Sequence, residues 1–293
     1  MEDKIDVVIV GSGLAGLVVA LSLLDESSLR VTVLEKEAKA GFGNSIKASS
    51  GINCVANQED LSLFIKDTVA SAGKSAQPEL IELLVRQSGD ALTWLRDRLD
   101  ADLSTKTQLG GHQAERTHRP SGKLPVGAEI MGKLRKAVEA APHRVQIRTN
   151  AKAQRLQVDA SSGAVTGIHF LDTETNQNRT ISASHVVLAT GGYAANRDLL
   201  KELRPDLANF PATLGPFSTG DGLRLGQEID AACTGLDKIQ VHPTGFVDPN
   251  DPDNPNKFLC AEVLRGVGGI LLNSNGQRYV PPGIPSRCET ESD

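Results

Sequence analysis

The residues with the most direct chemical meaning are three glycines near the start of the chain and an acidic residue that follows them. Gly11, Gly13 and Gly16 form the pattern Gly-x-Gly-x-x-Gly, and Glu35 comes roughly 20 residues later. Glycines at these positions let the backbone turn sharply and approach a pyrophosphate group closely. A carboxylate at this distance can bind the hydroxyl groups of an adenosine ribose. The pattern therefore predicts a dinucleotide site.

The elements that must hold these residues can be predicted from the sequence around them. Apart from Asp6, Ile5–Val10 is an apolar, β-branched run, typical of a strand that is buried on both faces. A second strand is expected over residues 30–34, ending at Glu35. Between the two strands, apolar residues recur at helical spacing, at Leu14, Leu17, Val18, Leu21 and Leu24. Strand, turn, helix, strand and acid in this order favour a nucleotide site over a glycine-rich turn that binds nothing.

Composition narrows the classes of partner. The chain has 293 residues, a net charge of −5 and 3% aromatic residues, which argues against a nucleic acid. Its four cysteines show no paired short spacing, so we expect neither a disulfide framework nor a metal site, and a reducing compartment. His112 and His118 lie six residues apart in a glycine-rich loop without a matching carboxylate, so they are not predicted to bind a metal.

The segment after Glu35 is a long loop rich in Gly, Ser and Asn, over residues 36–53. Long ordered loops in compact domains tend to be functional. The hydroxyls, amides and lysine of this loop could donate hydrogen bonds to a phosphate or to the polar edge of a flavin ring. An ordinary surface loop of small residues is the alternative.

Three residues further along the chain could do chemistry. His242 stands in the run Gln-Val-His-Pro-Thr, and a single histidine is more often structural than catalytic. Glu262 and Arg265 are spaced i, i+3, which places them on one face of a helix, where they could equally form a surface ion pair.

The glycine pattern, followed by Gly-Asn-Ser-x-Lys-Ala-Ser-Ser-Gly-Ile-Asn over residues 43–53, resembles the flavoprotein subunits of the fumarate reductase and succinate dehydrogenase family. The soluble, single-chain members from eukaryotic microbes look most similar. The resemblance implies FAD as the cofactor, with Lys47 near the isoalloxazine ring; Phe42 departs from the glycine common in the family. The cofactor-binding residues expected from it are Gly11, Gly13, Leu14, Ala15, Gly16, Glu35, Lys36, Asn44, Ser45, Ser49, Ser50, Gly51, Ala153, Thr190, Gly191 and Asp221.

The same resemblance implies a reaction, the reduction of fumarate to succinate by hydride transfer from reduced flavin. It assigns His242 to binding a substrate carboxylate, and Glu262 and Arg265 to a proton relay. Arg116 and His118 are expected beside the flavin in a structural or supporting role. The implied partners are a small dicarboxylate and an unidentified electron donor, with no nucleic acid and no membrane insertion.

We therefore expect an α/β fold with a Rossmann-like FAD-binding domain, in which a parallel sheet carries an antiparallel β-meander. Helices are predicted over 57–73, 78–99 and 127–141. Meander strands are predicted near 145–149, 154–158, 165–170 and 180–182, and a separate buried strand is predicted from 185 to the Ala-Thr-Gly-Gly turn at 189–192. The expected domains are 1–237 for FAD and 238–293 for the start of an incomplete capping domain.

The tail, 281–293, diverges from the family pattern, with Ser286 where an arginine that donates a proton is expected and Arg287 one residue later. The chain thus looks truncated, with fumarate reduction impaired. The alternatives are a truncated flavoprotein product without activity and another flavin oxidoreductase, such as an L-aspartate oxidase or a ketosteroid dehydrogenase. Only four residues precede Ile5, so no targeting segment is expected and the cytoplasm is the default; mitochondria or another organelle stay open.

Overall fold

The computed structural model describes residues 5–261, 264 and 268–279. Their contacts divide the chain into two units. The first unit runs to Lys47 and resumes over Met131–Leu259, and the second contains Ala48–Ile130 and the described residues from Cys260 onward. The domain boundary expected at residue 237 stays a prediction.

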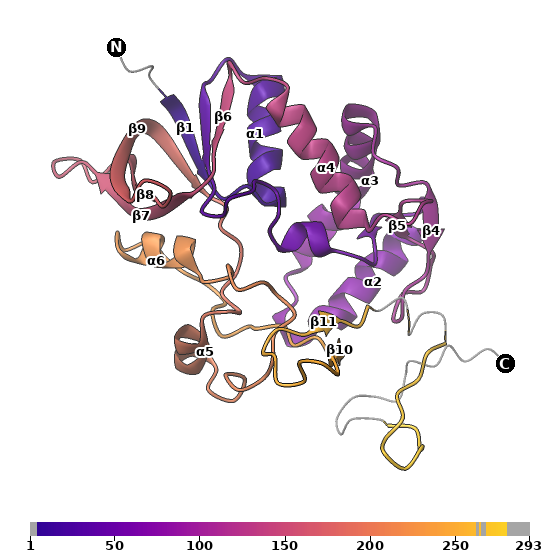
Figure 1. Ribbon diagram of the computed structural model, residues 1–293. Helices are drawn as coiled ribbons and strands as arrows, with labels where there is room; N and C mark the ends of the chain where they lie inside the picture. Colours follow the sequence, from indigo (N-terminus) through magenta and orange to yellow (C-terminus); the bar gives the residue numbers. More distant parts are fainter. Residues whose placement is uncertain (1–4, 262–263, 265–267, 280–293) are drawn as a thin grey trace. The chain divides into compact units, whose positions relative to one another are not determined.

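The first unit is built on a six-stranded sheet with the strand order β6-β2-β1-β9-β8-β7 (Figure 1). β1 pairs in parallel with β2 and β9, β2 pairs in parallel with β6, and β7, β8 and β9 pair antiparallel. The strands are β1 (Ile5–Val10), β2 (Val31–Leu34), β6 (Val145–Arg148), β7 (Ala151–Val158), β8 (Val165–Asp172) and β9 (Gln177–Leu188). This confirms the expected α/β fold with a parallel sheet and an antiparallel meander.

Successive side chains of β1 point to opposite faces of the sheet and contribute to two different packing layers. Val8 and Val10 belong to a buried cluster that includes Ile168 and Phe170 of the meander. Ile9, between them, is buried and points to the opposite face, where α1 (Leu14–Glu26) packs against the sheet. The part of a strand that is covered on both faces must be apolar, which explains the apolar run from Val7 to Val10; Asp6, before it, is only half-buried.

Two strands differ from their predictions. The strand near 145–149 was expected in the antiparallel meander, but β6 pairs in parallel with β2 at the edge of the parallel sheet. The other difference concerns β9. The sequence indicated a short meander strand near 180–182 and a separate strand from 185, but β9 runs without a break over both. Its first half pairs with β8 and its second half, from Ala183, pairs with β1. Short elements complete this unit: a 3-10 turn at Asn44–Lys47, α5 (Arg197–Leu203), α6 (Asp221–Gln227), β10 (Gly245–Phe246) and β11 (Phe258–Leu259).

The second unit consists mainly of two helices and a small antiparallel sheet. The helices α2 (Asp60–Ala72) and α3 (Pro78–Leu99) match the predicted spans closely. The sheet has the order β3-β5-β4, made by Ile52–Asn53, Thr117–Arg119 and Thr105–Thr107. The helix α4 (Val126–Glu139) begins here and continues into the first unit. No helix in the described part of the chain has the length and apolar character needed to cross a bilayer.

A fully buried arginine holds the second unit together. The Arg116 guanidinium donates hydrogen bonds to Asp60 and Asp67, and its carbon lies 4.6 Å from the centre of the Phe64 ring. Burial is the largest single influence and raises the pKa of both carboxyls. The hydrogen bonds and charge of Arg116, together with hydrogen bonds from Ala56 to Asp60 and from Gln113 to Asp67, hold each pKa below its usual value. The same bonds raise the pKa of Arg116 against the effect of burial.

Replacing this arginine is expected to destabilise the fold strongly. Arg116→Leu should lower the free energy of unfolding by about 3–5 kcal/mol at pH 7, because two buried carboxylates lose their counter-charge. Urea unfolding measures this. Arg86→Ala is the control, since Arg86 forms an exposed pair with Glu82 on α3 worth about 0.3–0.5 kcal/mol.

The effect should depend on pH with a defined sign. A carboxyl whose pKa is depressed in the folded state stabilises above its unfolded pKa, about 3.9, and loses that contribution as the pH falls through the folded value. The difference between wild type and Arg116→Leu should therefore shrink as the pH is lowered from 7 to about 3. A difference that is constant over this range would contradict the ion-pair explanation.

Candidate functional site

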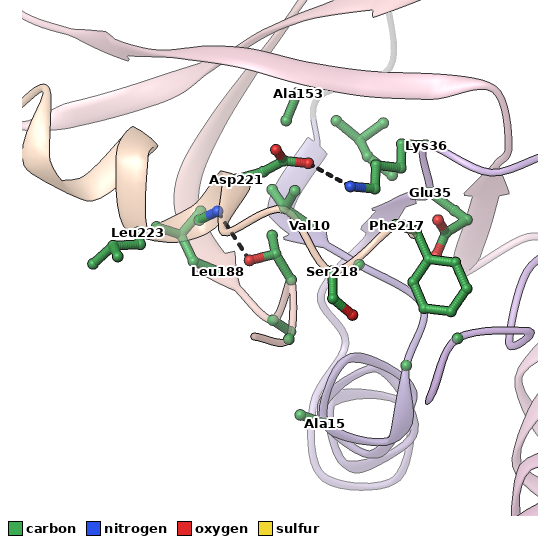
Figure 2. A pocket seen from close by; sticks show the side chains of 18 of the residues that line it. Val10, Ala15, Glu35, Lys36, Ala153, Leu188, Phe217, Ser218, Asp221 and Leu223 are labelled. Carbon is green, nitrogen blue, oxygen red and sulfur yellow. Dashed lines mark hydrogen bonds and ion pairs between the residues drawn. The ribbon is translucent and has the colours of Figure 1, made fainter. Parts of the chain in front are cut away.

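The first unit contains a cavity of about 530 Å³ at the carboxyl ends of the parallel strands β1, β2 and β9. In open α/β sheets, ligands bind at this end of the strands. Figure 2 shows the cavity between Glu35 and Lys36 from the end of β2, Leu188 from β9, and Asp221 at the start of α6.

The glycine turn forms one wall. Gly11 has φ +104°, and a Cβ there would lie 2.4 Å from the carbonyl oxygen of Ala189. A Cβ on Gly16 would lie 1.9 Å from the carbonyl oxygen of Gly11, so Gly16 packs the helix on the turn and does not line the cavity. Gly13 does line it, and a Cβ there would find only the Ser45 hydroxyl at 3.7 Å. The turn therefore leaves open space at the position where a phosphate would approach.

The Glu35 carboxylate is held by the turn itself. Its Oε2 accepts hydrogen bonds from the backbone N–H of Ser12, at 3.1 Å, and from the Ser12 hydroxyl. Its Oε1 accepts from the backbone N–H of Glu37 at 2.9 Å. The side chain thus has a defined orientation at the edge of the cavity.

An ion pair closes the other side. Lys36 Nζ lies 2.8 Å from Asp221 Oδ2 and 2.7 Å from the Thr219 hydroxyl, and Figure 2 marks the pair with a dashed line. Burial is the largest single influence and raises the pKa of Asp221. The hydrogen bond and charge of Lys36, together with the Thr219 hydroxyl, nevertheless hold the pKa below its usual value. Nearby, the Thr190 hydroxyl accepts from the backbone N–H of Gly222 at 2.9 Å. These bonds join β2, the end of β9 and α6 around one cavity.

The structure brings most of the predicted cofactor residues to this cavity. Those that line it are Gly11, Gly13, Leu14, Ala15, Glu35, Lys36, Asn44, Ser45, Ala153, Thr190, Gly191 and Asp221. Ser49, Ser50 and Gly51 belong to the second unit, and their role stays a prediction. Sequence reasoning missed Lys39, Phe217, Ala232 and Cys233 as lining residues. Phe217 could have been found from its place beside the Ser-Thr-Gly-Asp turn; the other three carry no local signal.

The predicted catalytic residues are only partly within the described structure. His242 Nδ1 lies 2.8 Å from the carbonyl oxygen of Thr244. The residue lines a separate cavity of about 430 Å³ together with Tyr193, Arg197 and Gln240. Glu262, Arg265 and the tail at 280–293 lie outside the described residues.

The polar loop of the second unit has a structural character. Arg116 is the buried hub described above, and His118 is buried with Nδ1 3.2 Å from the carbonyl oxygen of Leu103. Burial lowers the pKa of His118 and of His112. Among the described residues, no group of three or more His, Cys, Asp or Glu side chains could hold a metal ion.

The parallel sheet, the glycine turn and the acid at the end of β2 define an α/β dinucleotide-binding protein. The FAD binding domain family matches residues 6–293, so the chain belongs to this family and its cofactor is FAD. The cavity fits that group, because it offers open backbone at Gly13, a carboxylate at Glu35 and a length that spans from the end of β2 to the end of β9.

Known relatives include fumarate reductases and L-aspartate oxidases. The chain is 43% identical over 287 residues to fumarate reductase 1 of Saccharomyces cerevisiae, covering 94% of this chain and 60% of that protein. It is 37% identical to fumarate reductase of Schizosaccharomyces pombe, covering 93% of this chain and 55% of that protein. A flavocytochrome c3 fumarate reductase in its open conformation superposes with a TM-score of 0.78 at 31% identity, covering 95% of this chain and 48% of that chain. The chain therefore spans about half to 60% of the length of these relatives.

Because the chain is closely packed at the glycine turn, we expect a glycine-to-alanine substitution to have opposite effects on stability at two helical positions. Gly16→Ala should destabilise the fold by several kcal/mol, because a Cβ overlaps the Gly11 carbonyl oxygen. Gly132→Ala, in α4 with open space around it, should stabilise by about 0.5–1 kcal/mol, since alanine favours a helix. Thermal unfolding of both variants tests this. Equal effects would show that the turn can relax.

Proposed function

We propose that this chain binds FAD in the cavity at the glycine turn and belongs to an enzyme that reduces fumarate to succinate. The cavity supports FAD binding, because the turn, Glu35 and the Lys36–Asp221 pair surround one space of about 530 Å³, a volume typical of cofactor sites. The similarity to fumarate reductases over more than nine-tenths of the chain supports the second part.

The residues of the cavity suggest how FAD would be held. Glu35 would bind the adenosine ribose, and Gly13 with the first amides of α1 would face the pyrophosphate, which the positive end of the helix favours. Asn44 and Ser45, Ala153, and Thr190 with Gly191 would line the remaining length of the cofactor. The Lys36–Asp221 pair would keep two segments of the wall in place.

Reduction of fumarate adds a hydride to one olefinic carbon and a proton to the other. FAD, bound in its reduced form, supplies the hydride. In our proposal His242 binds one carboxylate of the substrate, which holds the double bond in position. Glu262 and Arg265 would relay the proton. The position of His242 in a cavity beside Tyr193 and Arg197 supports its part.

The proposal includes two points about context. An electron donor must reduce the flavin, and its identity is open. The cysteine spacing favours a reducing compartment, and the cytoplasm is the default within our proposal. Among the described residues, Cys54, Cys233 and Cys260 form no disulfide.

FAD binding has a direct test. The purified chain should show flavin absorbance that is released on denaturation. Glu35→Ala should weaken FAD binding by about 1–3 kcal/mol, or about 5- to 150-fold, through loss of a charge-assisted hydrogen bond. Glu26→Ala, at the exposed end of α1, is the matched control and should leave the affinity unchanged. Protein that cannot be loaded with FAD would contradict the proposal.

The substrate can be tested by binding and by turnover. Fumarate should perturb the flavin absorbance spectrum in a saturable manner, and His242→Ala should raise the dissociation constant about 10- to 100-fold through loss of a hydrogen bond to a carboxylate. Crotonate, with one carboxylate, should bind more weakly. Oxidation of a reduced viologen dye measures turnover with fumarate. Oxidation of L-aspartate without any response to fumarate would instead identify an L-aspartate oxidase.

A further inference from the structure

We propose that Ser12 is a positioning residue for the adenosine ribose of FAD, and that it leaves Glu35 able to accept only one ribose hydroxyl. This inference rests on the proposed cofactor site. It concerns a residue that lies between two of the glycines of the turn and that the sequence pattern leaves unspecified.

The Ser12 hydroxyl accepts one hydrogen bond and donates another, and the donor and acceptor of each bond are fixed. Ser12 is fully buried, and its Oγ accepts the backbone N–H of Gly41 at 2.9 Å. A hydroxyl carries one proton, and the Glu35 carboxylate can only accept, so the Ser12 proton goes to Glu35 Oε2. The chain of bonds therefore runs from Gly41 through Ser12 to Glu35.

Counting acceptor sites shows what remains for a ligand. An ionised carboxylate has about four lone-pair sites, two on each oxygen. Ser12 fills both sites of Oε2, with its N–H and its O–H, and the N–H of Glu37 fills one site of Oε1. One site on Oε1 stays open. Two ribose hydroxyls cannot both form a full hydrogen bond there.

The arrangement also orders Glu35 before the cofactor arrives. A glutamate side chain has several accessible rotamers, and binding that must select one of them loses affinity. Three donors from the backbone and from Ser12 select the rotamer in advance. Removing the Ser12 hydroxyl leaves the glycines of the turn unchanged, but it takes away one of the three donors. The Glu35 carboxylate, now held only by the backbone N–H groups of Ser12 and Glu37, is less well ordered.

The selectivity between ADP and its deoxy analogues distinguishes a role of Ser12 in positioning Glu35 from a purely structural role. The full 293-residue chain, stripped of flavin, is titrated calorimetrically with FAD, ADP, 2′-deoxyADP and 3′-deoxyADP. Wild type should bind ADP about tenfold more tightly than one of the two deoxy analogues and nearly as tightly as the other, which reflects one charge-assisted hydrogen bond. Ser12→Ala should reduce this ratio to about threefold, and Glu35→Ala should reduce it to about one.

Two further variants sharpen the test. The double variant Ser12→Ala/Glu35→Ala should match Glu35→Ala alone, since Ser12 acts through Glu35. Ser218→Ala is the matched control: Ser218 is a buried serine of the same cavity whose hydroxyl accepts from Asn44, and its loss should leave the tenfold ratio unchanged.

The possible contrary results are distinct. A wild type that loses affinity equally for both deoxy analogues would show that Glu35 binds both hydroxyls and would overturn the proposal without any variant. A Ser12→Ala chain that weakens ADP and both analogues by one common factor would assign Ser12 a structural role only. A wild type that binds ADP but not FAD, or neither, would refute the proposed cofactor site, and this inference with it.

Discussion

The architecture of the first unit depends on one constraint. The chain must turn away at the end of β1, which has the parallel strands β2 and β9 on its two sides. The backbone N–H of Gly11 donates to Leu34 of β2 at 2.8 Å, and Ala189, after β9, donates to Val10 at 2.8 Å. Only a residue without a Cβ can turn out of this position, since an added carbon would meet the Ala189 carbonyl. The turn that results forces β2 and β9 to end around open space, and it brings Ser12 and Glu35 together. The cavity is thus a consequence of how the central strand ends.

Two sets of charges show how burial decides the role of an ion pair. Arg116, Asp60 and Asp67 are almost fully buried, and their hydrogen bonds satisfy one another within the second unit. Lys36 and Asp221 keep 21% and 15% of their side-chain surface exposed, and they line a cavity. The buried set can stabilise only the fold, because no ligand reaches it. The second pair stands where a polar ligand can compete for or add to its hydrogen bonds.

Local patterns were sufficient to predict β1, α1, β2 and the glycine turn, because their signals lie within about 30 residues in a βαβ unit. The helices α2 and α3 were predicted from spacing for the same reason. The pairing of β9 with β1 joins residues far apart in sequence, and no local signal marks Ala183 as the point where β9 changes partner. The Lys36–Asp221 pair was likewise beyond prediction from spacing. Arg116 was expected in a structural or supporting role beside the flavin. The contacts described for it are structural, because its ion pairs hold its own unit together.

β9 has a consequence for how the first unit opens. A 12-residue strand that is hydrogen-bonded to β8 along one half and to β1 along the other couples the parallel and antiparallel parts of the sheet through a single backbone. The meander cannot detach by breaking side-chain contacts alone, because its last strand continues into the nucleotide-binding sheet. The parallel and antiparallel parts of the sheet should therefore exchange their amide protons as one cooperative unit, with similar protection on both sides of Ala183. A ligand held at the end of β9 would then slow the exchange of amides throughout the meander, including β8, which does not line the cavity.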